Sequence, residues 1–121
     1  MKASIVGRDA LACLTVLLAT SLWAQDMVKV APMNCTVLLD NDQVRVVRVV
    51  LQPGEKLPMH SHPANVVYSL SGGKAKYTLT DGKTEEREVK AGQTTWSEAG
   101  SHSTENTGTT ESRALVFELK K

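Results

Sequence analysis

The side chains best suited to chemistry are the three histidines, His60, His62 and His102. His60 and His62 stand two residues apart, and residues i and i+2 of a β-strand face the same side, so both imidazoles can reach one point. Neutral imidazoles that converge in this way are common ligands of divalent metals. The spacing alone leaves two alternatives open: a surface pair, or histidines that are hydrogen-bonded inside the protein.

The elements that must position these histidines are short strands, because no stretch has the 3.6-residue periodicity of an amphipathic helix. Val44 to Leu51 is dense in β-branched residues and ends before the turn pair Pro53-Gly54. Further strand segments bounded by turn residues are predicted at 65–70, 74–80, 84–89, 94–97, 102–106 and 114–119. Seven or eight short strands without a helix predict an all-β fold, either a sandwich or a closed barrel. Residues 25–35 are expected to form a loose lead-in or an extra edge strand.

The histidines stand within two longer patterns. The first runs from Gly54 through five residues to the H-x-H pair and closes at Gly72. The second runs from Gly92 to Asn106 and places His102 four residues before that asparagine. Together these patterns resemble the two signature motifs of the cupin superfamily.

The resemblance covers roughly residues 44–119 and implies a cupin-type jelly-roll β-barrel with a metal site. In that family the motif histidines bind one divalent metal inside the barrel, and they match His60, His62 and His102. Asn106 matches an asparagine with a structural role. The cofactor implied is one divalent ion of iron, manganese, nickel, copper or zinc.

Two positions depart from the motifs. Asn65 stands where the family usually has a glutamate ligand, and Glu98 stands where it usually has a proline. Without a carboxylate, three neutral imidazoles leave the metal with its full double charge, which favours an anionic ligand or substrate. We expect Asn65 at or near the fourth position, where it can coordinate through its amide oxygen or hydrogen-bond a metal-bound water. Three-histidine sites occur among cupins, notably in thiol dioxygenases, so the missing glutamate does not exclude a metal.

The first 24 residues read as a secretory signal peptide. Lys2 and Arg8 precede an apolar run at 10–19, and the segment ends at Ala24, a small residue suited to cleavage. The apolar run is shorter than the ~20 residues that span a bilayer, which argues against an uncleaved anchor. We therefore expect one cupin domain at 25–121, located in the periplasm or secreted.

The composition argues against some classes of binding partner. Basic and acidic side chains balance beyond Ala24, so nothing suggests the basic patch of a nucleic-acid-binding protein. No membrane-binding helix is visible. Cys35 is the one cysteine beyond Ala24 and cannot form an internal disulfide, so we interpret it as a small apolar filler. Because a two-sheet barrel of this size has edges to cover, we expect a homodimer.

Other residues are weaker candidates for the site. Aromatic side chains in strands are more often core than ligand-binding, and those that can line a barrel mouth are Tyr68, Tyr77 and Trp96. Charged residues of predicted strands are more often solvated. Those with an alternative role are Arg45 and Arg48, which can hold an anion, and Glu98 and Glu118, which can act as acid–base groups.

Three functional hypotheses remain. The first is a small exported metal-dependent enzyme of oxygenase, isomerase or lyase type that acts on a small polar or anionic molecule. The second is a barrel that binds a metal or small ligand without catalysis. The third is a structural or interaction protein with a vestigial site. The fold alone does not choose among them.

Overall fold

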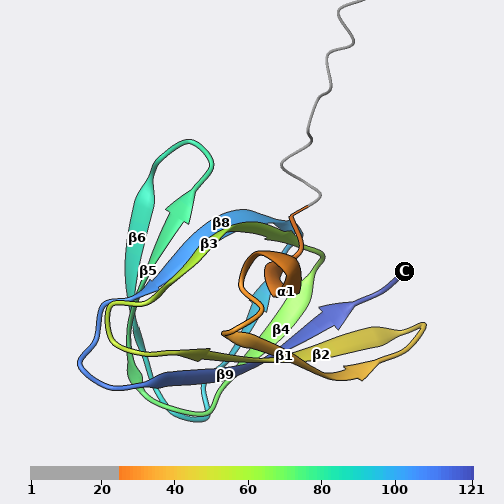
Figure 1. Ribbon diagram of the computed structural model, residues 1–121, viewed down its shortest axis with the longest axis horizontal. Coiled ribbons are helices and arrows are strands. Elements are labelled where there is room, and N and C mark those ends of the chain that lie inside the picture. The colour runs from red at the N-terminus through yellow and green to blue at the C-terminus, as the bar shows by residue number, and fades with distance from the viewer. Residues whose placement is uncertain (1–24) are drawn as a thin grey trace, which may run out of the picture.

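The computed structural model describes residues 25–121, and the predicted signal peptide at 1–24 lies outside the described residues. Two antiparallel sheets face each other, with a short helix, α1 (Met27–Val30), beside one end (Figure 1). The larger sheet has the order β1-β2-β9-β4-β7, with β1 (Cys35–Asp40), β2 (Val44–Leu51), β9 (Ser112–Leu119), β4 (Asn65–Ser69) and β7 (Thr94–Ser97). The smaller sheet has the order β3-β8-β5-β6, with β3 (Lys56–His62), β8 (Gly100–Asn106), β5 (Gly73–Leu79) and β6 (Thr84–Val89).

The predicted all-β class is confirmed, and the strand limits follow from local sequence. Val44–Leu51 forms β2 with the predicted bounds, and Thr84–Val89 and Thr94–Ser97 form β6 and β7 as predicted. Gly82 has a φ of 84°, a left-handed conformation that suits glycine and lets the chain turn tightly between β5 and β6.

The expectation of no helix was wrong at the start of the described chain. The carboxylate of Asp26 accepts a hydrogen bond from the Val28 backbone N–H at 2.7 Å and so caps α1. A four-residue helix is too short to show a helical period, which is why the sequence pattern missed it. Residues 25–35 hold α1 and no edge strand of the expected extent, whereas the edge strand β1 begins at Cys35 and was not predicted.

The apolar core lies between the sheets and against α1. Along β2 the side chains of Val47, Val49 and Leu51 are buried, whereas Arg48 is exposed, as the two-residue period of a strand requires. The remaining buried members of this cluster are Met27, Ala31, Cys35, Leu57 and Val116. Within residues 25–121 no helix has the length and apolar character needed to cross a membrane.

Candidate metal centre

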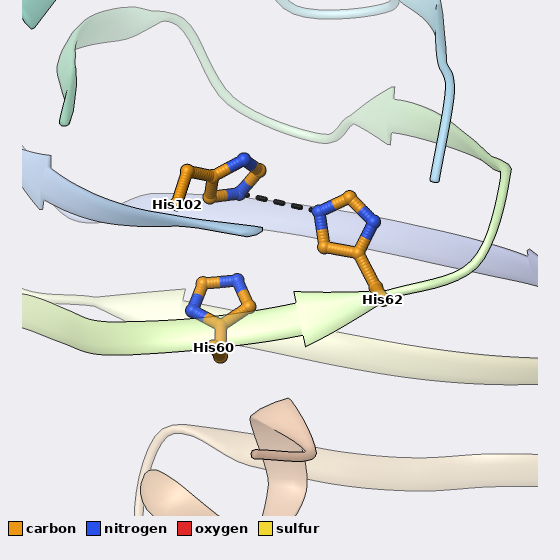
Figure 2. Close-up of side chains that lie close together, drawn as sticks. All are labelled: His60, His62 and His102. Carbon is orange, nitrogen blue, oxygen red and sulfur yellow. Dashed lines mark hydrogen bonds between the residues drawn. The ribbon is translucent and has the colours of Figure 1, made fainter. Parts of the chain in front are cut away.

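The pairing of β3 with β8 brings the three histidines together. His60 lies directly opposite His102 in the antiparallel register, and His62 lies opposite Gly100, which has no side chain. The centroids of the His60 and His102 rings are 4.8 Å apart, and those of His62 and His102 are 4.7 Å apart. Figure 2 shows the three rings turned toward one another, two from β3 and one from β8. One potential ligand atom from each ring lies within 4.8 Å of the others, so the convergence predicted from the H-x-H spacing is confirmed.

The distance between two of these nitrogens suits a shared ion. Nε2 of His62 and Nε2 of His102 are 3.4 Å apart. Two nitrogens bound at ~2.1 Å to one tetrahedral ion are themselves ~3.4 Å apart. The donor set therefore fits a divalent metal with imidazole ligands.

The backbone sets the proton position on His60. Its Nδ1 lies 2.8 Å from the carbonyl oxygen of Pro58. Because a carbonyl only accepts, Nδ1 carries the hydrogen and Nε2 keeps its lone pair. A metal-binding histidine usually has this arrangement, with the second ring nitrogen donating to a carbonyl or carboxylate.

Asn65 lies against His62, on the ring edge that does not face His102. Its amide nitrogen is 2.6 Å from Nδ1 of His62 and donates to the carbonyl oxygen of Pro63 at 2.9 Å. Nδ1 of His62 is also 3.1 Å from that same carbonyl oxygen. Asn65 is almost fully buried, with 1% of its surface exposed. Because Nδ1 of His62 must keep its hydrogen for Nε2 to bind a metal, Nδ1 donates to the Pro63 carbonyl, and Asn65 orients His62 by packing against it and donating to the same carbonyl. A role of Asn65 as fourth ligand stays a prediction.

Burial keeps His60 and His102 neutral. Desolvation lowers the pKa of His102 to about 3, with further lowering by His62, His60 and Arg87. Desolvation also lowers the pKa of His60, with a smaller contribution from His62. Since only the neutral imidazole can bind a metal ion, the cluster is ready to coordinate at neutral pH without losing protons from these two rings.

The histidines line a cavity of about 160 Å³ between the two sheets. Tyr77 of β5 lines it and meets His102 edge to face, with ring centroids 5.4 Å apart. Arg87 of β6 also lines it, with its guanidinium carbon 4.6 Å from the Tyr77 ring centroid. The cavity thus combines the histidines with an aromatic wall and a cation.

Two charged residues that were expected at the surface, Arg45 and Glu118, are largely buried. Arg45 and Glu118 lie opposite each other on β2 and β9, with 17% and 3% of their side chains exposed. The Nε of Arg45 donates to Oε1 of Glu118 at 2.6 Å, and Nη1 pairs with Asp26 at 2.7 Å. The surface expectation fails because each buried charge has an opposite charge in contact. Arg48 is exposed, as expected.

The remaining candidate residues either lie at the surface or have a structural role. Tyr68 and Trp96 are 40% and 54% exposed and do not line the histidine cavity, so neither the core nor the barrel-mouth interpretation holds for them. Exposed Glu98 accepts a hydrogen bond from Nε1 of Trp96 at 2.9 Å. Asn106 has its predicted structural role: its amide nitrogen donates to the carbonyl oxygens of Leu51 and Thr110, both at 2.9 Å.

Arg87 and its partner Glu85 were missed by the sequence analysis. They stand two residues apart on β6 and therefore share a face, but β6 is a polar strand whose faces look alike in sequence. The informative signal was the Asp81-Gly82 turn, which sets the register and places Glu85 opposite Tyr77.

Comparison with known proteins agrees with this architecture. The model of the cupin domain matches residues 47–118. A cupin domain from Bordetella pertussis Tohama I superposes with a TM-score of 0.68 at 25% identity, over 72% of this chain and 92% of that chain. A cupin family protein with a double-stranded β-helix fold from Methanocaldococcus jannaschii gives a TM-score of 0.59 at 18% identity, over 71% and 78%.

A third similar structure is described by an activity. It is a predicted oxalate decarboxylase from Thermotoga maritima, with a TM-score of 0.53 at 30% identity, over 70% of this chain and 78% of that chain. The comparison with curated proteins found no match. Because the cupin domain model covers more than half of the sequence and the two sheets form the same double-stranded β-helix, this chain belongs to the cupin family.

Proposed function

We propose that this cupin binds one divalent metal through His60, His62 and His102 and acts on a small polar or anionic molecule. The observation that carries the proposal is the convergence of three ring nitrogens within 4.8 Å at the wall of an internal cavity. A bound ion would supply Lewis acidity toward an oxygen of the bound molecule. Three neutral ligands leave the double charge of the ion uncompensated, which favours an anion in the open positions.

Catalysis is the more specific form of the proposal. Support comes from two similar structures, which are described as a predicted oxalate decarboxylase and as a polyketide cyclase. The alternative is a barrel that binds its ligand and performs no reaction. The two are separated by incubating the metal-loaded protein with small carboxylic acids and following product formation, because a binding barrel is stabilised by its ligand without turnover.

We also propose that the protein works after export. The support is the signal-peptide pattern at residues 1–24, with the predicted cleavage after Ala24. N-terminal sequencing of the protein recovered from the periplasm or the medium should begin at Gln25. Recovery with Met1 intact from the cytoplasm would contradict this.

Elemental analysis of the full protein, purified without a metal-affinity tag, tests the metal site. We expect near-stoichiometric iron, manganese, nickel, copper or zinc, and less than a tenth of that amount in His60→Gln. A matched control is Thr104→Val, which changes a residue two positions from His102 on the same face of β8 and should keep the metal. Absence of metal in the wild type, even after incubation with each ion, would reject the proposal.

A further inference from the structure

Arg87 places a fixed cation on the wall of the histidine cavity. It lies opposite Ala75 in the pairing of β6 with β5, and its guanidinium carbon is 4.6 Å from the centroid of the Tyr77 ring. The same ring meets that of His102 edge to face, with the centroids 5.4 Å apart. One aromatic ring therefore separates the guanidinium from the histidine cluster.

Glu85 orients this guanidinium but uses only part of it. The Nε of Arg87 donates to Oε1 of Glu85 at 2.9 Å, and Nη2 donates to Oε2 at 3.0 Å. A guanidinium has five N–H donors. Among residues 25–121, the Nη1 group and the second Nη2 hydrogen have no hydrogen-bond partner. The edge formed by two such amino groups binds a carboxylate through two parallel hydrogen bonds.

The other charged side chains that line the cavity are less suited to this task. Arg113 is paired with Glu111 at 2.7 Å, and 58% of its side chain is exposed. Glu105 is acidic and lies 4.0 Å from the ammonium of Lys76. Arg87 is thus the cation that ring contacts connect to the histidines, and with 45% of its side chain exposed it is within reach of an entering molecule.

The cavity limits the size of that molecule. Its volume is about 160 Å³. Pockets for drug-sized ligands measure about 300–1,000 Å³, so this cavity suits a smaller molecule. A molecule that spans from Arg87 to the histidines is therefore small.

We propose that Arg87 binds the carboxylate of the molecule taken by the histidine site, and that this molecule is a small carboxylic acid with a second oxygen, nitrogen or sulfur donor for the metal. The inference rests on the proposed function, since the second donor needs the ion. Glu85 positions Arg87 and leaves its outer edge to the ligand.

Calorimetric titration of the zinc-loaded protein with glycolate tests this inference. Glycolate carries a carboxylate and a hydroxyl, and glycolamide is its neutral analogue. Arg87→Gln should weaken glycolate binding at least tenfold and leave the zinc affinity within twofold of the wild type. Glycolamide should bind the wild type at least tenfold more weakly than glycolate and should be insensitive to the substitution.

Two further variants control for charge and for Glu85. Arg113→Gln removes another arginine from the cavity lining and should leave glycolate binding unchanged. Glu85→Gln removes one of the two hydrogen bonds that orient Arg87, so glycolate should bind more weakly than to the wild type and more tightly than to Arg87→Gln. Equal glycolate affinity in Arg87→Gln and wild type, or no glycolate binding by zinc-loaded wild type, would overturn the inference and leave the metal site standing.

Failure of the proposed function would show separately, as absence of zinc binding by the wild type. Glycolate would then be titrated into wild type and Arg87→Gln without zinc. A tenfold loss in the variant would support a carboxylate site at Arg87, and equal or absent binding would reject it.

Discussion

His60 and His102 face each other across β3 and β8 as direct partners, with their rings nearly perpendicular at 85° and 4.8 Å apart. Both rings are removed from solvent, and protonating either would place a charge beside another imidazole in a poorly solvated space. Burial, followed by the neighbouring histidines, therefore lowers the pKa of His102 to about 3 and lowers that of His60.

The lowered pKa of His102 predicts a loss of stability in acid. In the unfolded chain this histidine has a pKa near 6.5, and in the folded protein about 3. Between these values the unfolded state binds a proton that the folded state does not, so stability falls as the pH is lowered from 6.5 toward 3. The urea midpoint of the protein stripped of metal should drop between pH 7.5 and pH 4.5. In His102→Gln the drop should be smaller, and an equal drop would contradict the assignment.

Asn65 is predicted to support metal binding through His62. Removing a residue that orients a metal ligand typically costs 10–100-fold in affinity. Asn65→Leu should therefore weaken zinc binding roughly tenfold in a competition titration with a chromophoric chelator. Asn65→Glu tests whether residue 65 faces the ion, because a carboxylate there should tighten binding. Weakening by both substitutions would support the orienting role, and unchanged zinc affinity in Asn65→Leu would reject it.

The sequence predicted the strands better than their pairing. Proline, glycine and β-branched residues define where β2 begins and ends, whereas β1 was missed because a register shift between Val37 and Leu39 disturbs its alternation. The convergence of His60 and His62 follows from their two-residue spacing. The position of Arg87 at the histidine cavity could not be predicted from residue spacing, because it depends on the register of β6 against β5.

The ion pair between Arg45 and Glu118 is predicted to be essential for stability. Removing one partner of a buried pair leaves the other charge uncompensated and costs about 3–5 kcal/mol. Arg45→Met should lower the free energy of unfolding by about that amount in urea denaturation. The double variant Arg45→Met/Glu118→Met should recover part of the loss. Arg48→Met, on the exposed face of the same strand, is the control and should change stability by less than about 0.5 kcal/mol. Equal effects at positions 45 and 48 would contradict the prediction.

Cys35 is predicted to be unreactive in the folded protein. Its side chain is buried, and desolvation, with a smaller contribution from Asp26, raises its pKa to about 11. Only the thiolate attacks disulfide reagents. With Cys13 replaced by Ala so that Cys35 is the only thiol, the protein should not react with Ellman's reagent at pH 8 until denaturant is added. Rapid modification of the native protein would show an accessible thiolate instead.

We expect the homodimer to form through the outer face of the larger sheet. Leu39, Val46, Phe117, Val66 and Trp96 form one apolar row across its five strands, because each is the register partner of the next. Leu39 is 49% exposed and Trp96 is 54% exposed. Val46, within the row, is buried. Exposed apolar side chains on a sheet face are typical of an interaction surface, and a second copy would cover the exposed ends of the row about a two-fold axis.

Substitution within this apolar row tests the dimer. Light scattering coupled to size exclusion should give the mass of a dimer for the wild type. Trp96→Glu should shift it to the mass of a monomer with little change in folding, because Trp96 lies at the end of the row and is already half exposed. Met33→Glu adds the same charge at a residue that is 93% exposed and outside the sheet, so it should leave the dimer intact. A dimer that survives Trp96→Glu, or a wild type that is monomeric, would contradict this interface.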